Sequence, residues 1–433
     1  MVDGVETIAQ DPVSSPIQKA LAINLDPLKY GTIVEIGAGQ EVARWFFQAG
    51  AAAGTIAKTM SAYDMKFSDE IYGETSDRRY VSRARLERML QQEFDLVVER
   101  IADHRPEGSR FFAFANTVAA QGFRRRDECH GWIGVRLQME PRAEPDEIIL
   151  HVRMLDDTNI EQQEALGILG VNLIHGAFEH ATDPKNLLRR LMDNLKWGRV
   201  EIDLVEFRGP TLGGIDNRLM SLELVKASLT RAVLFDPDGS ISIPAEELHR
   251  NSVLAMRGAF YPLRDADTAI FEDARGKFLS RPDVEEGSVL YLAELTMAEL
   301  ANDEEIDTAN FLGRVNALSA AGFHVMISEF FRYFRVRQYF ARYSNLPVGF
   351  VTDARGFADI FHETYYDGIR GGILEGLGQT FPVPTVAYVY PGEEGGRRVR
   401  LDDLPVADDL CPLLDFLRKR GQVVAVDEFG PGA

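Results

Sequence analysis

The chain has 433 residues, of which 45% are hydrophobic and 26% charged, a composition typical of folded globular proteins. Its 47 basic and 67 acidic side chains give a formal net charge of -20, which disfavours nucleic acids and anionic membranes as partners. Two distant cysteines exclude a disulfide framework. No apolar run approaches the about 18 residues of a membrane span, and the N-terminal residues lack a secretory signal. We therefore expect a cytoplasmic protein that binds neither nucleic acid nor membrane.

A chain of this length predicts two or three domains, because a single hydrophobic core rarely grows so large. Residues 1–22 contain two prolines and two serines without apolar periodicity, which is typical of a flexible leader. We expect a mixed α/β domain over residues 23–250 and an α/β domain over 251–433, with the boundary between 240 and 285.

The N-terminal elements mix helices and strands irregularly. An apolar strand over 32–37 precedes a helical pattern over 42–60 that two glycines interrupt. A stronger helix is predicted over 80–104, where Ser82 is a candidate cap and apolar side chains recur every three or four residues. Further strands are predicted over 110–119, 131–139, 147–155 and 200–207. Because several strands follow one another without helices between them, we expect a mixed sheet and an α+β arrangement here.

The C-terminal elements alternate more regularly. Strands are predicted over 289–296, 323–330, 347–353 and 385–391, with helical segments over 308–322, 335–344 and 357–378 between them. This rhythm is typical of a parallel sheet with helices on both faces. The predicted fold class is therefore α/β, with a mixed α+β N-terminal part and a doubly wound C-terminal part.

The segment Glu35-Ile36-Gly37-Ala38-Gly39 follows an apolar strand and resembles the methyl-donor motif of class I methyltransferases. Glycine is needed in such a turn because the backbone bends sharply and approaches the ligand closely. A dinucleotide or methyl-donor site also needs a second strand that ends in an acid about 20 residues on, and we find no convincing apolar strand before Asp64. The turn is therefore either a ligand site or a tight corner.

Lys58 and Asp64 lie soon after this turn and extend the candidate site formed by Glu35, Gly37 and Gly39. Lys58 offers a cation for a phosphate, and Asp64 offers an oxygen for a metal or a hydroxyl. The alternative is a solvent-facing helix end, which contains the same residue types.

Two weaker candidates lie further along the chain. Asp236 and Asp238 follow an apolar strand and resemble the first motif of haloacid-dehalogenase-like phosphatases, but Pro-Asp-Gly is also a common turn. Arg335 and Arg337 lie among aromatic residues after a predicted strand, where a doubly wound domain would bind an anion. Their alternative is an amphipathic helix whose rings enter the core.

The histidine and cysteine spacings do not match a metal motif. His175 and His180 are five residues apart, and Cys129 and His130 are adjacent, so neither pair is arranged like the ligands of known zinc motifs. We expect no structural metal site, and the sequence assigns neither a cofactor nor a catalytic residue.

Four phrases of the chain resemble a widespread, uncharacterised bacterial protein family, from about Asn24 to about Leu410. They are NLDPLKYGTIVEIGAGQEVARWFF, GTIAKTMSAYDM, RYVSRARLERML and GGILEGLGQTF. Members of that family carry two conflicting labels, nicotinate-nucleotide adenylyltransferase and TonB-linked receptor. The first label implies a G-x-F-x-P-x-H-x-G-H turn whose histidines contact ATP phosphates and a later S-x-T-x-x-R, and neither occurs here. The second implies a signal peptide and many amphipathic strands, and neither is visible.

Together these patterns favour a cytoplasmic homo-oligomer that binds a nucleotide or another phosphorylated small molecule at the Gly37–Gly39 turn. The first alternative is a non-enzymatic assembly or scaffold protein whose arginine-rich helix contacts another subunit. The second alternative is a methyltransferase that uses S-adenosylmethionine.

Overall fold

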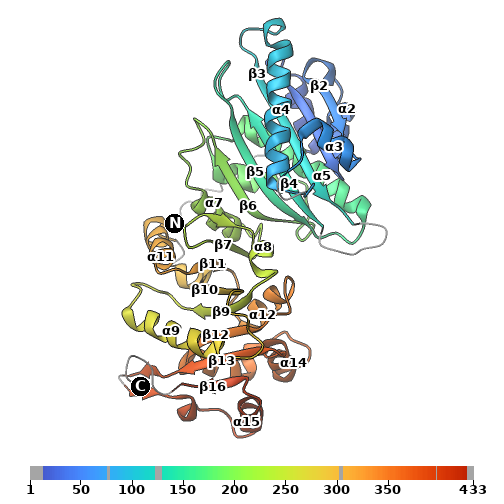
Figure 1. Ribbon diagram of the computed structural model, residues 1–433. Coiled ribbons are helices and arrows are strands. Elements are labelled where there is room, and N and C mark those ends of the chain that lie inside the picture. The colour runs from blue at the N-terminus through green and yellow to red at the C-terminus, as the bar shows by residue number, and fades with distance from the viewer. Residues whose placement is uncertain (1–12, 76–78, 122–128, 302–305, 396, 427–433) are drawn as a thin grey trace, which may run out of the picture. The chain divides into compact units, whose positions relative to one another are not determined.

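The computed structural model describes residues 13–75, 79–121, 129–301, 306–395 and 397–426. The chain divides into two compact units, unit 1 (Met1–Thr230) and unit 2 (Arg231–Ala433) (Figure 1). This division precedes the range of 240 to 285 in which the sequence placed the boundary. The reason is that β7 (Ala232–Phe235) pairs with a strand of the second sheet.

Unit 1 is built on a sheet of six strands within the described residues, in the order β2-β1-β3-β4-β5-β6. The strand β1 runs parallel to both of its neighbours, β2 and β3, whereas β3 to β6 are successively antiparallel. The strands are β1 (Lys29–Gly37), β2 (Ile56–Ser61), β3 (Arg110–Ala119), β4 (His130–Leu137), β5 (Asp146–Met154) and β6 (Val200–Arg208). The expected mixed sheet is confirmed.

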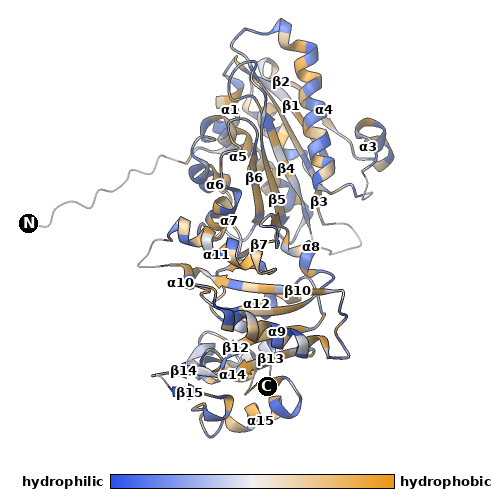
Figure 2. Ribbon diagram, turned by 60° about the vertical axis from the view of Figure 1, so that its left-hand side comes forward, coloured by the Kyte–Doolittle hydropathy of each residue, from blue (hydrophilic) through white to orange (hydrophobic). Residues whose placement is uncertain are grey.

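Helices cover both faces of this sheet. Gly134 of β4 faces α4 (Arg83–Ile101), and Phe114 of β3 faces the opposite side, where α5 (Asn159–Glu179) packs with α2 (Glu41–Ala49). In Figure 2, α4 alternates between hydrophilic and hydrophobic colour, because only one of its sides meets the sheet. The remaining helices of unit 1 are α1 (Pro16–Asn24), α3 (Met65–Tyr72), α6 (Pro184–Leu191) and α7 (Asn217–Lys226).

Two N-terminal predictions need correction. The expected leader over 1–22 includes α1, which belongs to the fold because Ala20 and Ile23 are fully buried; residues 1–12 lie outside the described part of the chain. The helical pattern over 42–60 is also wrong. The helix α2 stops before Gly50, which has a φ of 81°, and the chain then forms β2 beside β1.

Unit 2 contains a sheet of eight strands within the described residues, in the order β16-β13-β12-β9-β10-β11-β7-β8. The first six are parallel, and they spread from β9 in both directions. This is a doubly wound arrangement, as expected. The strands are β7, β8 (Ile241–Ser242), β9 (Ser252–Arg257), β10 (Val289–Thr296), β11 (His324–Ser328), β12 (Val348–Asp353), β13 (Thr385–Tyr390) and β16 (Val423–Ala425).

Helices and a small hairpin complete unit 2. The helix α12 (Tyr333–Ala341) directs Phe334, Tyr339 and Phe340 into a large cluster of buried side chains. The other helices are α8 (Pro244–Leu248), α9 (Asp265–Leu279), α10 (Met297–Leu300), α11 (Thr308–Ala320), α13 (Ala354–Ala358), α14 (Gly372–Thr380) and α15 (Cys411–Lys419), and the hairpin is β14 (Gly392–Glu394) with β15 (Arg397–Val399). No helix in the described parts of either unit is long and apolar enough to cross a membrane.

Candidate functional site

The glycine turn joins the end of β1 to the start of α2. Gly37 has a φ of +87°, and a Cβ atom there would lie 2.0 Å from the carbonyl oxygen of Val118. A Cβ atom on Gly39 would lie 2.1 Å from the side-chain oxygen of Asn116. Both neighbours belong to β3, so packing against that strand accounts for the two glycines without a ligand.

Glu35 lies two residues before the turn and is only 3% exposed. Burial raises the pKa of its carboxyl from 4.5 to about 8, against the effect of a hydrogen bond from the Ala43 backbone, and the charge of Glu41 adds to the rise. Its Oε1 atom has no hydrogen-bond partner in the described chain. Asn116, its register partner on β3, is fully buried, and neither polar atom of its side chain is paired.

A cavity of about 480 Å³ opens beside Glu35, between α2 and β2. Its volume falls within the range of small-molecule sites, roughly 300–1,000 Å³. Phe47 and the side chain of Arg44 are 55% and 62% exposed, and Arg44 pairs with Glu41 at 3.0 Å. The cavity is lined by Glu35, Gln40, Ala43, Arg44, Phe47, Gln48, Thr59, Met60 and Ser61. It therefore combines a buried acid, a surface cation and an exposed aromatic ring.

Lys58 and Asp64 do not join this cavity. Lys58 is the register partner of Thr32, so it points to the face that α4 covers, and its Nζ lies 2.6 Å from Glu93 of α4. Asp64 caps α3 by accepting a hydrogen bond from the Phe67 backbone at 2.9 Å. The sequence grouped these residues with Glu35 because they are close along the chain. The pleat of the sheet separates Lys58 from Glu35, and Asp64 has the capping role of a helix end.

The weaker candidates also have structural partners. Arg337 is 3% exposed and donates from Nε to the Thr385 hydroxyl at 2.9 Å, so it is not available to another subunit, whereas Arg335 is exposed. Asp236 and Asp238 lie in the turn between β7 and β8, where Asp238 accepts a hydrogen bond from the Ser240 backbone at 2.8 Å. The hairpin turn explains the Pro-Asp-Gly sequence.

The sequence analysis missed three polar residues that contact one another, of which His151 and Asp203 are buried and His130 is partly buried. His151 lies between His130 and Asp203, with its Nε2 at 3.0 Å from Nδ1 of His130 and its Nδ1 at 2.6 Å from Oδ1 of Asp203. The three come from β4, β5 and β6, and burial lowers the pKa of His130 to about 4. No pattern within one strand marks these residues, because charged side chains such as Arg136 and Glu147 share the same face of the sheet.

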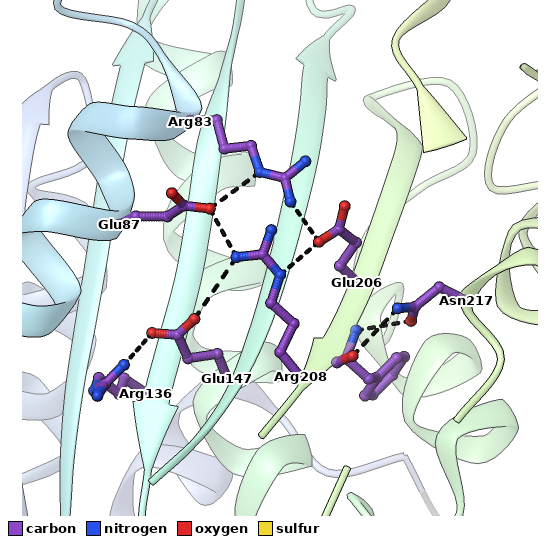
Figure 3. A network of polar contacts seen from close by, with 8 residues as sticks. Arg83, Glu87, Arg136, Glu147, Glu206, Arg208 and Asn217 are labelled. Atoms are coloured by element: carbon purple, nitrogen blue, oxygen red, sulfur yellow. Dashed lines mark hydrogen bonds and ion pairs between the residues drawn. The ribbon is translucent and has the colours of Figure 1, made fainter. Parts of the chain in front are cut away.

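The same face of the sheet carries a network of arginines and glutamates, shown in Figure 3. Arg83 and Arg208 meet at Glu206, with distances of 2.6 Å and 2.7 Å. Arg208 also contacts Glu87 at 2.7 Å, and Arg136 pairs with Glu147. Because acids and bases alternate within this network, it offers no unpaired cation for an anionic ligand.

Unit 2 contains part of the turn that the adenylyltransferase label implies. Residues 258–262 read G-x-F-x-P and follow β9. At the two histidine positions of the motif stand Arg264 and Asp267, which bind each other at 2.6 Å and cap α9. The histidines that would contact ATP phosphates are therefore absent, and the site does not fit that chemistry.

A second cavity, of about 700 Å³, lies beside the end of β12. Arg355, His362 and Arg397 line it together with Asp353, Asp359 and Asp403. The three basic side chains belong to exposed residues, so this cavity lacks a buried polar anchor comparable to Glu35.

Comparisons with known proteins do not assign the chain to a family. No protein-family model matches it, and no curated protein matches it. Among solved structures, it is similar to the competence/damage inducible protein CihA from Agrobacterium tumefaciens, at 17% identity over 38% of this chain and 97% of that protein. The TM-score is 0.28, which is too low to support an argument about fold or function.

Proposed function

We propose that unit 1 binds a nucleotide in the cavity between α2 and β2, with Glu35 as its buried polar anchor. The observation that carries this proposal is the Glu35 carboxyl itself. It is 3% exposed, borders an open cavity, and leaves one oxygen without a partner within the described chain. A buried polar atom without a partner costs about 1–3 kcal/mol, and a bound ligand that hydrogen-bonds to it would remove that cost.

The chemistry of the cavity favours a nucleotide over a bare phosphate compound. With a pKa of about 8, Glu35 is protonated at neutral pH, so it donates one hydrogen bond and accepts others. The edge of a base or a ribose hydroxyl needs this combination, whereas a phosphate needs donors alone. Phe47 presents an exposed ring on which a base can stack, and Arg44 offers a charge to the phosphate at the rim.

Native mass spectrometry of the gently purified protein is the first test. The spectrum reports any retained ligand with the mass of a nucleotide. It also reports the number of subunits, and the sequence analysis leads us to expect more than one. Isothermal titration calorimetry with AMP, ATP and S-adenosylmethionine then identifies the ligand. Binding of S-adenosylmethionine alone would favour the methyltransferase alternative.

Matched variants locate the site. Phe47→Ala should weaken nucleotide binding about fivefold or more, because stacking on an aromatic ring is worth about 1–3 kcal/mol. Phe416→Ala is the control, because Phe416 is 56% exposed on a helix of unit 2 and Phe47 is 55% exposed. Gly39→Val is unsuitable as a test, because its side chain would overlap Asn116 and disturb the fold itself.

Substitutions of Glu35 test its role as the buried anchor separately. Glu35→Leu should abolish binding, whereas Glu35→Gln, which copies the protonated carboxyl, should retain it. Wild-type affinity should fall as the pH rises past about 8, and Glu35→Gln should remove that dependence. If no nucleotide binds, or if Phe47→Ala and Glu35→Leu bind as well as the wild type, the proposal is wrong.

A further inference from the structure

Three side chains capable of binding a metal converge in unit 2, and none of them lines the proposed nucleotide cavity. Asp236, Glu247 and His324 each offer one ligand atom, and these atoms lie within 4.8 Å of one another. The Nε2 atom of His324 is 3.7 Å from Oδ1 of Asp236 and 4.0 Å from Oε2 of Glu247. All three residues are partly buried.

The topology of unit 2 explains this convergence. In the antiparallel pair of β7 and β11, Phe235 lies opposite Val325, so the next residues outward, Asp236 and His324, are neighbours across the two strands. The chain then turns through β8 into α8, which supplies Glu247. The ligands therefore come from three elements and lie far apart in sequence, which is why no motif spacing revealed them.

The polar atoms of this cluster do not satisfy one another. Both distances from His324 exceed the range of a hydrogen bond, about 2.7–3.2 Å. Oδ1 of Asp236 is buried and has no hydrogen-bond partner in the described chain, although Ser240 donates to the other oxygen at 3.3 Å. Among the described residues, neither Asp236 nor Glu247 forms an ion pair with a lysine or an arginine. Two carboxylates thus face one imidazole nitrogen without a cation.

We propose that Asp236, Glu247 and His324 bind one divalent transition-metal ion, such as Zn²⁺ or Mn²⁺. Ligands of a tetrahedral ion with bonds of about 2.1 Å are separated by about 3.4 Å. The observed 3.7 Å and 4.0 Å require contractions of about 0.3 Å and 0.6 Å, and the two carboxylate oxygens, which lie within 4.8 Å of each other, would also have to approach. The imidazole favours a transition metal over Mg²⁺ or Ca²⁺, which prefer oxygen alone. With three protein ligands, a fourth position remains open to water, and the ion would link the β7–β8 hairpin and α8 to β11.

The experiment is a calorimetric titration of the full, chelator-treated chain with ZnCl₂, MnCl₂ and MgCl₂. Cys129 and Cys411 are the two cysteines of the chain, and both are replaced by serine in every sample to remove adventitious zinc ligands. His324→Ala, Asp236→Asn and Glu247→Gln each remove one ligand. His362→Ala is the matched control, because this histidine is exposed in the same unit.

We expect one equivalent of Zn²⁺ or Mn²⁺ to bind the parent protein, with at least tenfold weaker binding in each ligand variant and no change in the control. The ion should also raise the melting temperature of the parent protein, because it binds the folded state alone. Absence of transition-metal binding, or affinity unchanged by Glu247→Gln and Asp236→Asn in chains with native circular dichroism, would overturn the proposal. Both variants are near-isosteric, so they keep the test open if His324→Ala does not fold.

Discussion

Replacing Glu35 by glutamine is expected to change how the stability of unit 1 depends on pH. The pKa of Glu35 is 4.5 when unfolded and about 8 when folded, mainly because the carboxyl is buried. Between these values the folded chain holds a proton that the unfolded chain has released, so wild-type stability falls as the pH rises. Each pH unit in this window is worth about 1.4 kcal/mol, so the loss between pH 5 and pH 8.5 is about 4 kcal/mol. Glutamine cannot ionise, so the Glu35→Gln variant avoids this loss of stability.

Tryptophan fluorescence is a suitable assay, because all three tryptophans, Trp45, Trp132 and Trp197, lie in unit 1. Urea unfolding of the wild type and of Glu35→Gln at pH 5 and pH 8.5 gives four free energies of unfolding. The quantity of interest is the stability of the variant minus that of the wild type at each pH. Other titrating groups occur in both proteins, so they cancel in this difference.

The difference should rise by about 4 kcal/mol in favour of glutamine from pH 5 to pH 8.5. Glu99→Gln, on the exposed side of α4, should show no comparable change. A difference that stays constant within about 1 kcal/mol would refute the reasoning, because it would mean that the Glu35 carboxyl ionises as readily in the folded chain as in the unfolded one.

Three further predictions concern the same unit. Lys58→Met should lower the free energy of unfolding in urea by about 2 kcal/mol, because it removes the cation that pairs with the buried Glu93. It should leave nucleotide affinity unchanged, and weakened binding would mean that Lys58 belongs to the site. Gly37→Ala should lower the free energy of unfolding by at least about 2 kcal/mol, because Gly37 has a positive φ and a Cβ atom there would overlap Val118. Gly54→Ala, whose Cβ atom would have nothing within 4 Å, should lower it by less than about 0.5 kcal/mol. Equal losses of stability would contradict the explanation by packing. His130 has a pKa lowered from 6.5 to about 4 by burial, so wild-type stability should fall as the pH drops through that window. His130→Asn should lose less over the same window, and parallel pH profiles would contradict this assignment.

Local patterns predicted the elements whose signals are complete within one segment. The spacing of apolar residues and the cap at Ser82 indicated α4, which begins at Arg83. The strand-helix rhythm indicated the doubly wound part of unit 2, although β9 was not predicted. The strand β2 was missed because it lies at the sheet edge and one of its inward positions holds a charged residue, Lys58, which interrupts the apolar alternation. Tertiary pairing with β1 decides its structure, and no local signal contains that pairing.

The composition of the candidate site could be predicted only in part, for a similar reason. Glu35 was identified from its place before the glycine turn. Asn116, its neighbour in the fold, is 81 positions further along the chain (116 minus 35) and becomes adjacent only through the register of β1 and β3. Lys58 is closer in sequence, yet the alternation of side chains along β2 directs it to the opposite face. Proximity in sequence therefore led to a wrong grouping of residues, because strand register decides which side chains meet.

The two glycines of the turn and the neighbouring Glu35 give different evidence on whether this region binds a ligand. Gly37 and Gly39 fill positions where any Cβ atom would overlap β3, so the shape of the turn needs no ligand. Glu35 is another matter, because packing alone gives no reason to bury a carboxyl group. A hydrophobic side chain at that position would avoid both the desolvation cost and the unpaired oxygen. The fold carries this cost without an internal partner for Oε1 in the described chain. A ligand in the adjoining cavity is the simplest source of compensation, and the acid is therefore stronger evidence for a site than the glycines are.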